Sequence, residues 1–258
     1  MRLERCTYPQ AAAYFAEHDT VLMQFGSIEQ HGRHNPLGTD LFAPSKITDL
    51  VEEQLPGLMI VPAMPFGSTN RFVDYPGTIS LGDHLLYEVV LKIATDLYHD
   101  GARKFVFVNG HGGNTKSLTE VQLVLSRMGC RCALIDWWKM CGDFNPSWAG
   151  GHGGGQETSA NLYIDPTMVD LGAVDDMNLI NDLGPAFKTV HYDSVEFEGV
   201  RVQVSRPLED YSQNGWIGPD HPKDASAAWG EEMLNTVANW LVHFITAFEA
   251  LELPKPTR

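Results

Sequence analysis

The sequence has little positive charge, and its Lys and Arg residues form no cluster. It contains 18 Lys and Arg against 33 Asp and Glu, which gives a formal net charge of -15 at pH 7. A surface with this balance repels phosphate groups and anionic lipids. We therefore expect neither a nucleic-acid partner nor a membrane partner.

Long apolar runs and cysteine motifs are also missing. No run approaches the roughly 18 to 20 apolar residues that cross a bilayer, and the opening residues MRLERCTYPQ lack the apolar centre of a signal peptide. The four cysteines have neither CxxC nor zinc-ribbon spacing, so we expect free structural thiols. These absences favour a cytoplasmic protein. The cysteines are Cys6, Cys130, Cys132 and Cys141.

Apolar, β-rich runs alternate with amphipathic helical patterns along most of the chain. The length of 258 residues is enough for a full hydrophobic core. The alternation predicts one α/β domain over residues 1–258, with a mainly parallel sheet and helices on both faces. Strands are expected at residues 20–26, 58–63, 104–108 and 131–135, and helices at 9–18, 41–55, 83–99, 115–128, 157–164 and 224–251.

Three stretches lack a clear periodic pattern. Residues 64–81 form a long loop with aromatic and aliphatic side chains, which we expect to be ordered and to line the site. Residues 136–155 are rich in Trp and Gly and are predicted to be irregular, either as a lid or as core packing. Within 172–222 one hairpin is expected, with strands at 187–192 and 200–205.

Metal-ligand side chains follow the first predicted strand. The stretch TVLMQFGSIEQHGRHNPLGTD, residues 20–40, runs from an apolar strand into a polar segment that carries Glu29, His31, His34 and Asp40. Ligands in open α/β sheets bind beyond the carboxyl ends of the strands. Glu29 and His31 are two residues apart, so they point to one side of an extended segment and suit one metal or two adjacent metals.

The same arrangement occurs twice more, which favours a site over an ordinary solvated loop. NGHGGN places His111 after another buried strand, and GHGGGQETS places His152 and Glu157 in a glycine-rich run that leads into a helix. Glycines allow a backbone or a ligand to approach closely. The three segments together predict one polar site.

These motifs resemble the creatininase (creatinine amidohydrolase) family. The matching pieces are GSIEQHGRHNPLGTD, YPGTISL, NGHGGN, GHGGGQETS and GWIGP, in the family's order and over nearly the whole chain. The resemblance implies a three-layer α/β/α fold and two divalent metals, commonly zinc and manganese. It also implies a homo-oligomer, often a hexamer built from dimers, that acts on a small-molecule substrate.

The resemblance also assigns roles to individual residues. It makes Asp40 the ligand that bridges the two metals and takes a further ligand from Glu157 in the ETS turn. Creatininases proper have an acid where this chain has Gly113, and a second acid where it has Gly151. The implied metal ligands are Glu29, His31, Asp40, His111 and Glu157.

His152 matches the family's catalytic histidine. An imidazole that titrates near neutrality suits protonation of a leaving nitrogen. Trp138 and Trp148 match tryptophans that enclose a ring-shaped substrate, and Ser68 in the 64–81 loop is expected to contact the substrate.

The first functional hypothesis is therefore hydrolysis of a small, cyclic amide such as creatinine, by water that the two metals activate. Members with this fold are also associated with removal of a formyl group from a nucleotide precursor, trimming of a cofactor-precursor peptide, and ring opening of an oxidised inositol of the 3-dehydro-scyllo-inosose type. A hypothesis of another class is a non-catalytic small-molecule binding module with an anion cradle at NGHGGN.

Overall fold

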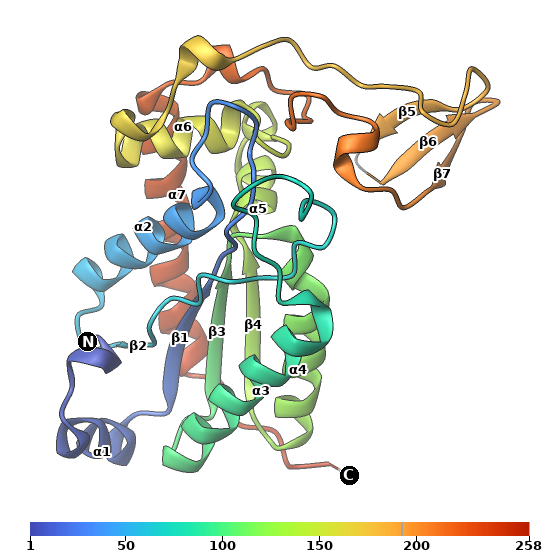
Figure 1. Cartoon of the computed structure of the whole chain (residues 1–258). Coiled ribbons are helices and arrows are strands. Elements are labelled where there is room, and N and C mark those ends of the chain that lie inside the picture. Colours follow the sequence, from blue (N-terminus) through green and yellow to red (C-terminus); the bar gives the residue numbers. More distant parts are fainter. Residues whose placement is uncertain (192, 258) are drawn as a thin grey trace.

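The computed structural model describes residues 1–191 and 193–257. A four-stranded, wholly parallel sheet with strand order β2-β1-β3-β4 forms its centre (Figure 1). This sheet confirms the predicted α/β class, although β2 is shorter than the expected strand at 58–63. The strands are β1 (Thr20–Phe25), β2 (Met59–Ile60), β3 (Lys104–Asn109) and β4 (Arg131–Asp136).

The three longest strands end at the same level of the sheet. Phe25 of β1 pairs with Asn109 of β3, which in turn pairs with Asp136 of β4. The loops that follow these strands therefore start side by side. This register brings distant polar segments to one edge.

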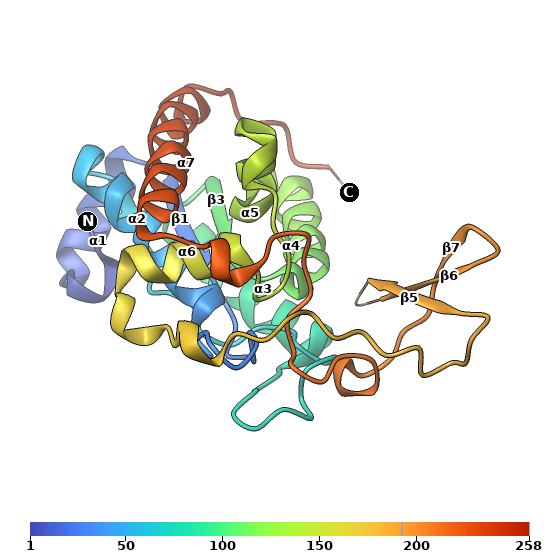
Figure 2. The same cartoon turned by 90° about the horizontal axis from the view of Figure 1, so that it is seen from above.

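One face of the sheet packs on α2 (Thr39–Gln54), α6 (Gly155–Ile164) and α7 (Ala227–Glu249), as Figures 1 and 2 show. Alternate residues of the strands, such as Leu22 and Val106, point into this layer. The long helix α7 begins three residues later than expected because Ser226 caps it, accepting a hydrogen bond from the Trp229 N–H.

The opposite face packs on α1 (Tyr8–Glu17), α3 (Gly82–Asp100) and α4 (Thr115–Arg127). Val21, Phe105 and Phe107 point into this second core. Strands that are buried on both faces read as continuous apolar runs, which is why they were legible in the sequence. The predicted three-layer architecture is confirmed. Within the described residues no helix is long and apolar enough to cross a membrane.

The prediction that residues 136–155 are irregular was wrong for their first half. Helix α5 (Trp137–Phe144) follows β4 directly. Trp137 and Cys141 are one helical turn apart, and both are buried against the α7 side of the core. The helical spacing was hidden because the segment also contains several tryptophans and glycines.

The predicted hairpin was also wrong in its pairing. A separate antiparallel sheet contains β5 (Lys188–His191), β6 (Ser194–Phe197) and β7 (Val200–Gln203), with β6 between the other two. The turn from β6 to β7 uses Glu198 and Gly199, both with positive φ, as a two-residue hairpin turn requires. Residue 192 of the expected strand lies outside the described residues. Figure 1 shows this sheet standing away from the main sheet on two long segments.

Candidate metal and active site

A cavity of about 800 Å3 opens at the carboxyl edge of the parallel sheet. Its inner end is formed by the loop after β1, the turn after β3 and the start of α6. Residues of the β5–β7 region form its outer end, among them His191 and Arg206. The predicted site residues that line it are Glu29, Ser68, Asp40, His111, Trp138, His152 and Glu157.

Asp40 lies at the centre of the polar cluster. It sits in the first turn of α2, only 3% exposed, with Oδ1 3.0 Å from His31 Nε2 and Oδ2 2.9 Å from His111 Nδ1. The Ser27 hydroxyl donates a hydrogen bond to Oδ2 at 2.7 Å. Asp40 therefore faces both of the histidines that follow β1 and β3.

Glu29 is fully buried, and both of its carboxylate oxygens lack a hydrogen-bond partner in the described structure. Its Oε1 lies 3.3 Å from His111 Nδ1 and 3.9 Å from His31 Nε2. Burying a carboxylate without hydrogen bonds is costly unless a cation compensates it. The carboxylate of Glu29 thus has the surroundings expected of a metal ligand.

Two groups of possible ligand atoms share Asp40. One is Glu29, Asp40 and His111, and the other is His31, Asp40 and Glu157; within each group the ligand atoms lie within 4.8 Å of one another. Carboxylate oxygens and imidazole nitrogens are ligands that zinc and manganese accept. The residues present therefore fit two adjacent divalent ions joined by Asp40.

Backbone carbonyls orient two of the histidines. His31 Nδ1 lies 3.1 Å from the Glu29 carbonyl oxygen, and His111 Nε2 lies 2.9 Å from the Ser68 carbonyl oxygen. A carbonyl only accepts hydrogen bonds, so these two ring nitrogens carry the protons. The other nitrogen of each ring faces the cluster, where it would offer a lone pair to a bound metal, as metal-ligating histidines do.

Glu157 reaches the same cluster from the first turn of α6. Its Oε2 accepts a hydrogen bond from the Gly153 N–H at 2.6 Å and lies 3.6 Å from His31 Nε2. Burial raises the pKa of Glu157 to about 8, against the opposing effect of His31. The structure therefore brings all five predicted ligands together.

The carboxylates of the cluster favour the protonated form of the two histidines beside them. Burial opposes protonation of His31, yet the nearby carboxylates, Asp40 first, raise its pKa to about 10. Burial likewise opposes protonation of His111, but Glu29 and Asp40 raise its pKa well above the ordinary value. Burial would raise the pKa of Asp40, whereas the two imidazoles hold it well below its usual range. Divalent ions would take the place of these protons.

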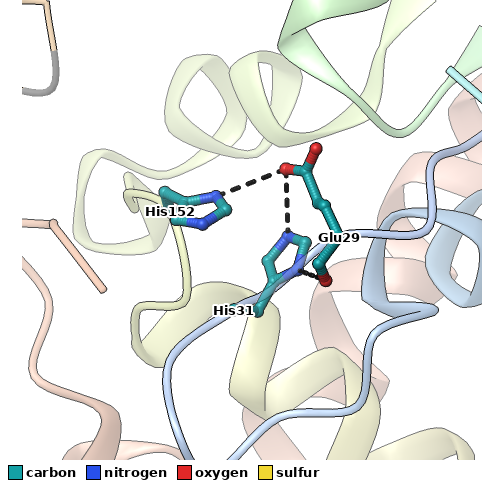
Figure 3. Close-up of side chains that lie close together, drawn as sticks. All are labelled: Glu29, His31 and His152. Atoms are coloured by element: carbon teal, nitrogen blue, oxygen red, sulfur yellow. Dashed lines mark hydrogen bonds and ion pairs between the residues drawn. The ribbon is translucent and has the colours of Figure 1, made fainter. Parts of the chain in front are cut away.

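His152 forms a third group of possible ligand atoms with Glu29 and His31, but its contacts differ from those of the two other histidines. Its Nδ1 faces Glu29 Oε1 at 3.7 Å (Figure 3). Its Nε2 lies 2.9 Å from the Gln30 side-chain nitrogen. Burial, followed by the charge of His31, lowers the pKa of His152 well below its ordinary value. These surroundings favour the neutral imidazole in the metal-free protein.

Two glycines mark where this chain departs from creatininases proper. A Cβ at Gly113 would overlap the Ser68 carbonyl oxygen and the His111 ring, and a Cβ at Gly151 would overlap the Ile217 carbonyl oxygen. Neither position has room for an acidic side chain in this backbone arrangement. Besides Glu29 and Asp40, the cluster contains one further acid, Glu157, which comes from the first turn of α6.

The predicted substrate-contacting residues lie in different places. Trp138 and Ser68 line the cavity, and the Ser68 hydroxyl donates a hydrogen bond to Asp83. Trp148 does not line the cavity. It is 8% exposed and packs in the core on the α7 side, and its carbonyl oxygen accepts a hydrogen bond from Gln156. The substrate role of Trp148 was assigned by resemblance to the family's tryptophans and stays a prediction.

Sequence reasoning did not single out three residues that shape the site. Gln30 contacts His152, and Phe72 stacks on the His152 ring with centroids 4.5 Å apart. Asp220 accepts hydrogen bonds from the N–H groups of Gly151 and Gln156 and so holds the loop that carries His152. Asp220 directly follows GWIGP, and that adjacency was the available signal.

His34 supports the loop after β1 and lies outside the groups of possible ligand atoms. It is 2% exposed. Its Nε2 lies 3.0 Å from the Gly153 carbonyl oxygen and 3.2 Å from the Thr158 hydroxyl. It ties the loop after β1 to the loop before α6.

Fold and site together define an α/β protein with a carboxylate and imidazole cluster, suited to divalent cations, at the carboxyl edge of a parallel sheet. Residues 4–245 match the family model Creatininase, described as creatinine amidohydrolase. The chain belongs to the creatininase family, as its motifs predicted.

Similar proteins differ in their described activities. The chain is 30% identical to a creatinine amidohydrolase of Pseudomonas putida over 66% of this chain and 74% of that protein. It is 32% identical to a mycofactocin precursor peptide peptidase of Mycobacterium ulcerans over 58% of this chain, and the match spans 60% of the peptidase, less than two thirds of its length. A mutant creatininase structure of Zn-Zn type aligns with a TM-score of 0.77 and 25% identity, over 97% of this chain and 98% of that chain.

Proposed function

We propose that the protein is a metal-dependent hydrolase that cleaves a carbon–nitrogen amide bond. The observation that carries this proposal is the pair of ligand groups that share Asp40, with the buried carboxylate of Glu29 lacking any hydrogen bond. Glu29, Asp40 and His111 would hold one divalent ion, and His31, Asp40 and Glu157 the other. When bound, such ions lower the pKa of a coordinated water and polarise a substrate carbonyl.

The protein's own residues would orient the substrate and exclude water. His152 lines the cavity beside Glu29 and is the catalytic side chain of this proposal. Phe72 covers one face of its ring, and Trp138 supplies an aromatic wall. In the NGHGGN turn Gly112 lines the cavity, and a Cβ there would meet only Trp138, at 3.8 Å.

The size of the cavity favours a substrate larger than creatinine. Cavities of several hundred Å3 enclose ligands of drug size, and about 800 Å3 is available here. The outer wall carries Arg71, Asp193 and Arg206, which lie outside the metal-ligand groups. An extended, peptide-like amide would use both ends of the cavity, and the similarity to the mycobacterial peptidase supports this second candidate.

The decisive experiment measures metal and activity together. Protein purified without chelator is analysed for metal per chain, beside the Asp40→Ala variant. We expect about two divalent ions per chain in the parent, a chelator-sensitive activity that zinc or manganese restores, and the loss of both ions and activity in the variant. Glu209→Ala, an exposed acid outside the cavity, is the matched control.

The substrate screen covers creatinine, short peptides, formamides and inosose-type ring ketones. Cleavage of a ring ketone instead of an amide would favour the ring-opening reaction. Failure to bind zinc or manganese, together with tight binding of a phosphorylated small molecule without turnover, would favour the non-catalytic binding module.

We also propose that the metals are zinc or manganese and that the chain works in the cytoplasm as a homo-oligomer, with a hexamer as the expected form. Support for self-association comes from apolar side chains on the β5–β7 sheet, where Phe197 is 39% and Val202 is 48% exposed. Exposed apolar groups gathered on one element are typical of contact surfaces. Light scattering of the purified protein measures the number of chains per particle.

A further inference from the structure

The side-chain amide of Gln30 is held in one orientation. Its Oε1 accepts a hydrogen bond from the Gly32 N–H at 2.9 Å, and its Nε2 donates to the Gly215 carbonyl oxygen at 2.9 Å. A backbone N–H only donates and a carbonyl only accepts, so the two contacts exclude the flipped amide. Gln30 is 5% exposed, and water does not compete for these bonds.

The second N–H of the Gln30 amide is directed at His152. The two Nε2 atoms lie 2.9 Å apart. Because Gln30 donates in this contact, His152 Nε2 accepts and carries no proton. A neutral His152 therefore has its proton on Nδ1, which is the nitrogen that faces Glu29 (Figure 3).

This arrangement is the reverse of that at His31 and His111. In those two rings one nitrogen donates a hydrogen bond to a backbone carbonyl oxygen, and the other faces the cluster, where it would offer a lone pair to a bound metal. His152 Nε2 accepts a hydrogen bond from the Gln30 amide, and its Nδ1–H faces the cavity. The 3.7 Å between His152 Nδ1 and Glu29 Oε1 is longer than a hydrogen bond, so Glu29 does not take up this N–H.

The His152 ring has little freedom to turn. Phe72 stacks on it at an interplanar angle of 6°, and the His31 ring lies with its centroid 4.4 Å away. Gly215, at φ 81°, makes the contact with Gln30 possible, because a Cβ there would overlap Gln30 Oε1. The GWIGP segment thus contributes its first glycine to the orientation of Gln30.

We propose that Gln30 is a positioning residue that holds His152 as the neutral Nδ1–H tautomer, so that His152 donates a hydrogen bond to the developing oxyanion of the amide. The role of His152 in the reaction is then to stabilise negative charge. His152 does not transfer a proton through Nε2. This inference rests on the proposed hydrolase function for the oxyanion, whereas the tautomer is a property of the protein alone.

Nitrogen-15 NMR of the zinc-loaded protein tests the tautomer without any substrate. The His152 signals are identified by their loss in His152→Gln. We expect a protonated Nδ1 and an unprotonated Nε2 throughout the neutral pH range. A proton on Nε2, or on both nitrogens, in the zinc-loaded parent would overturn the proposal.

Two substitutions of Gln30 distinguish an effect on the His152 tautomer from an effect on side-chain packing. The carboxylate of Gln30→Glu accepts a hydrogen bond, so it should move the proton of His152 to Nε2. Gln30→Met keeps the length of the side chain and leaves both tautomers accessible. Zinc content, measured for each variant, must equal that of the parent.

The kinetic expectation follows from the same contrast. On the amide that the screen identifies, Gln30→Glu should lower kcat by about 10²- to 10³-fold with little change in KM, as loss of one oxyanion donor does. Gln30→Met should lower kcat less, and Gln30→Glu should cost nothing further in a His152→Ala background. Equal losses in both Gln30 variants would contradict a role in setting the tautomer. No turnover of any amide, with the NMR result intact, would instead refute the hydrolase proposal.

Discussion

The two ends of the cavity are built in different ways. The inner end lies on the edge of a parallel sheet that is covered by helices on both faces, and its polar groups are almost wholly buried. The outer end comes from a small antiparallel sheet that stands apart on two long segments, and β7 is exposed along its length. The same cavity thus has one rigid wall and one sparsely packed wall.

This difference assigns different tasks to the two ends. Ligand atoms for a metal must be held to within a fraction of an ångström, which requires rigid supporting elements. Recognition of the remainder of a substrate tolerates variation, and loops and small sheets usually supply it. We therefore expect substitutions at the inner end to change metal binding and kcat, and substitutions at the outer end to change KM.

The largest effect is expected from Glu29→Gln. The amide has the same shape but lacks the charge that the buried carboxylate contributes, so at least one metal ion should be lost. Activity should fall by about a thousandfold or more, because metal ions supply several kcal/mol of transition-state stabilisation. Metal analysis and rates of amide cleavage measure this. Glu209→Gln, an exposed residue outside the cavity, should retain both metals and full activity.

Gly113→Ala tests how tightly the inner end is packed. Its Cβ would overlap the Ser68 carbonyl oxygen, which orients His111. We expect a loss of about 1–3 kcal/mol of stability and a decrease of about 10- to 100-fold in metal affinity. Gly57→Ala is the control, because a Cβ at Gly57 meets no atom within 4 Å. Denaturant unfolding and metal titration would contradict this prediction if both variants behaved alike.

Metal affinity should rise with pH. The pKa of His31 is raised to about 10 in the cluster, so its ring is protonated at neutral pH and a metal must displace that proton. For each proton that the metal displaces, the metal affinity should rise about tenfold per pH unit. This rise should end when the pH reaches the pKa of His31. Isothermal titration calorimetry in buffers of different ionisation enthalpy counts the protons released. A pH-independent affinity without proton release would show that the metal does not bind at His31.

The smallest effect is expected at the outer end, from Arg71→Gln. Arg71 lines the cavity and contacts Ser205 at 3.5 Å, on the segment after β7. With a peptide substrate, KM should rise about two- to fivefold, the value of roughly 0.5–1 kcal/mol for one ion pair near the protein surface, while kcat stays the same. With creatinine neither constant should change, because so small a molecule does not reach this wall. A change in kcat would contradict the prediction that the outer end of the cavity affects only KM.

Much of the inner end was predictable from the sequence, because it depends on local order. The apolar runs of β1 and β3 mark buried strands, and the parallel alternation places their carboxyl ends together. His31 and His111 follow those strands within a few residues, and Asp40 ends the same polar segment after β1, so a local pattern was enough to gather them. Glu157 was assigned only by resemblance, since the spacing within its own segment does not show which cluster it joins.

The outer end was less predictable, because its structure depends on weak local signals. The turn at Glu198 and Gly199 contains only one glycine, so the strand between the two expected ones went unrecognised. Helix α5 was missed for a similar reason, since its tryptophans suggested a lid. Trp148 lies near His152 in the sequence, but its side chain packs into the core.

The sequence by itself determined the family, the parallel α/β architecture and the identity of the side chains at the strand ends, because strand periodicity and short motifs are local. Only the tertiary structure decided how those side chains are oriented. Gln30 reaches His152 across 122 residues, and Ser68 reaches His111 across 43. Which ring nitrogen carries a proton depends on a partner supplied by a distant segment, and no spacing in the sequence contains that information.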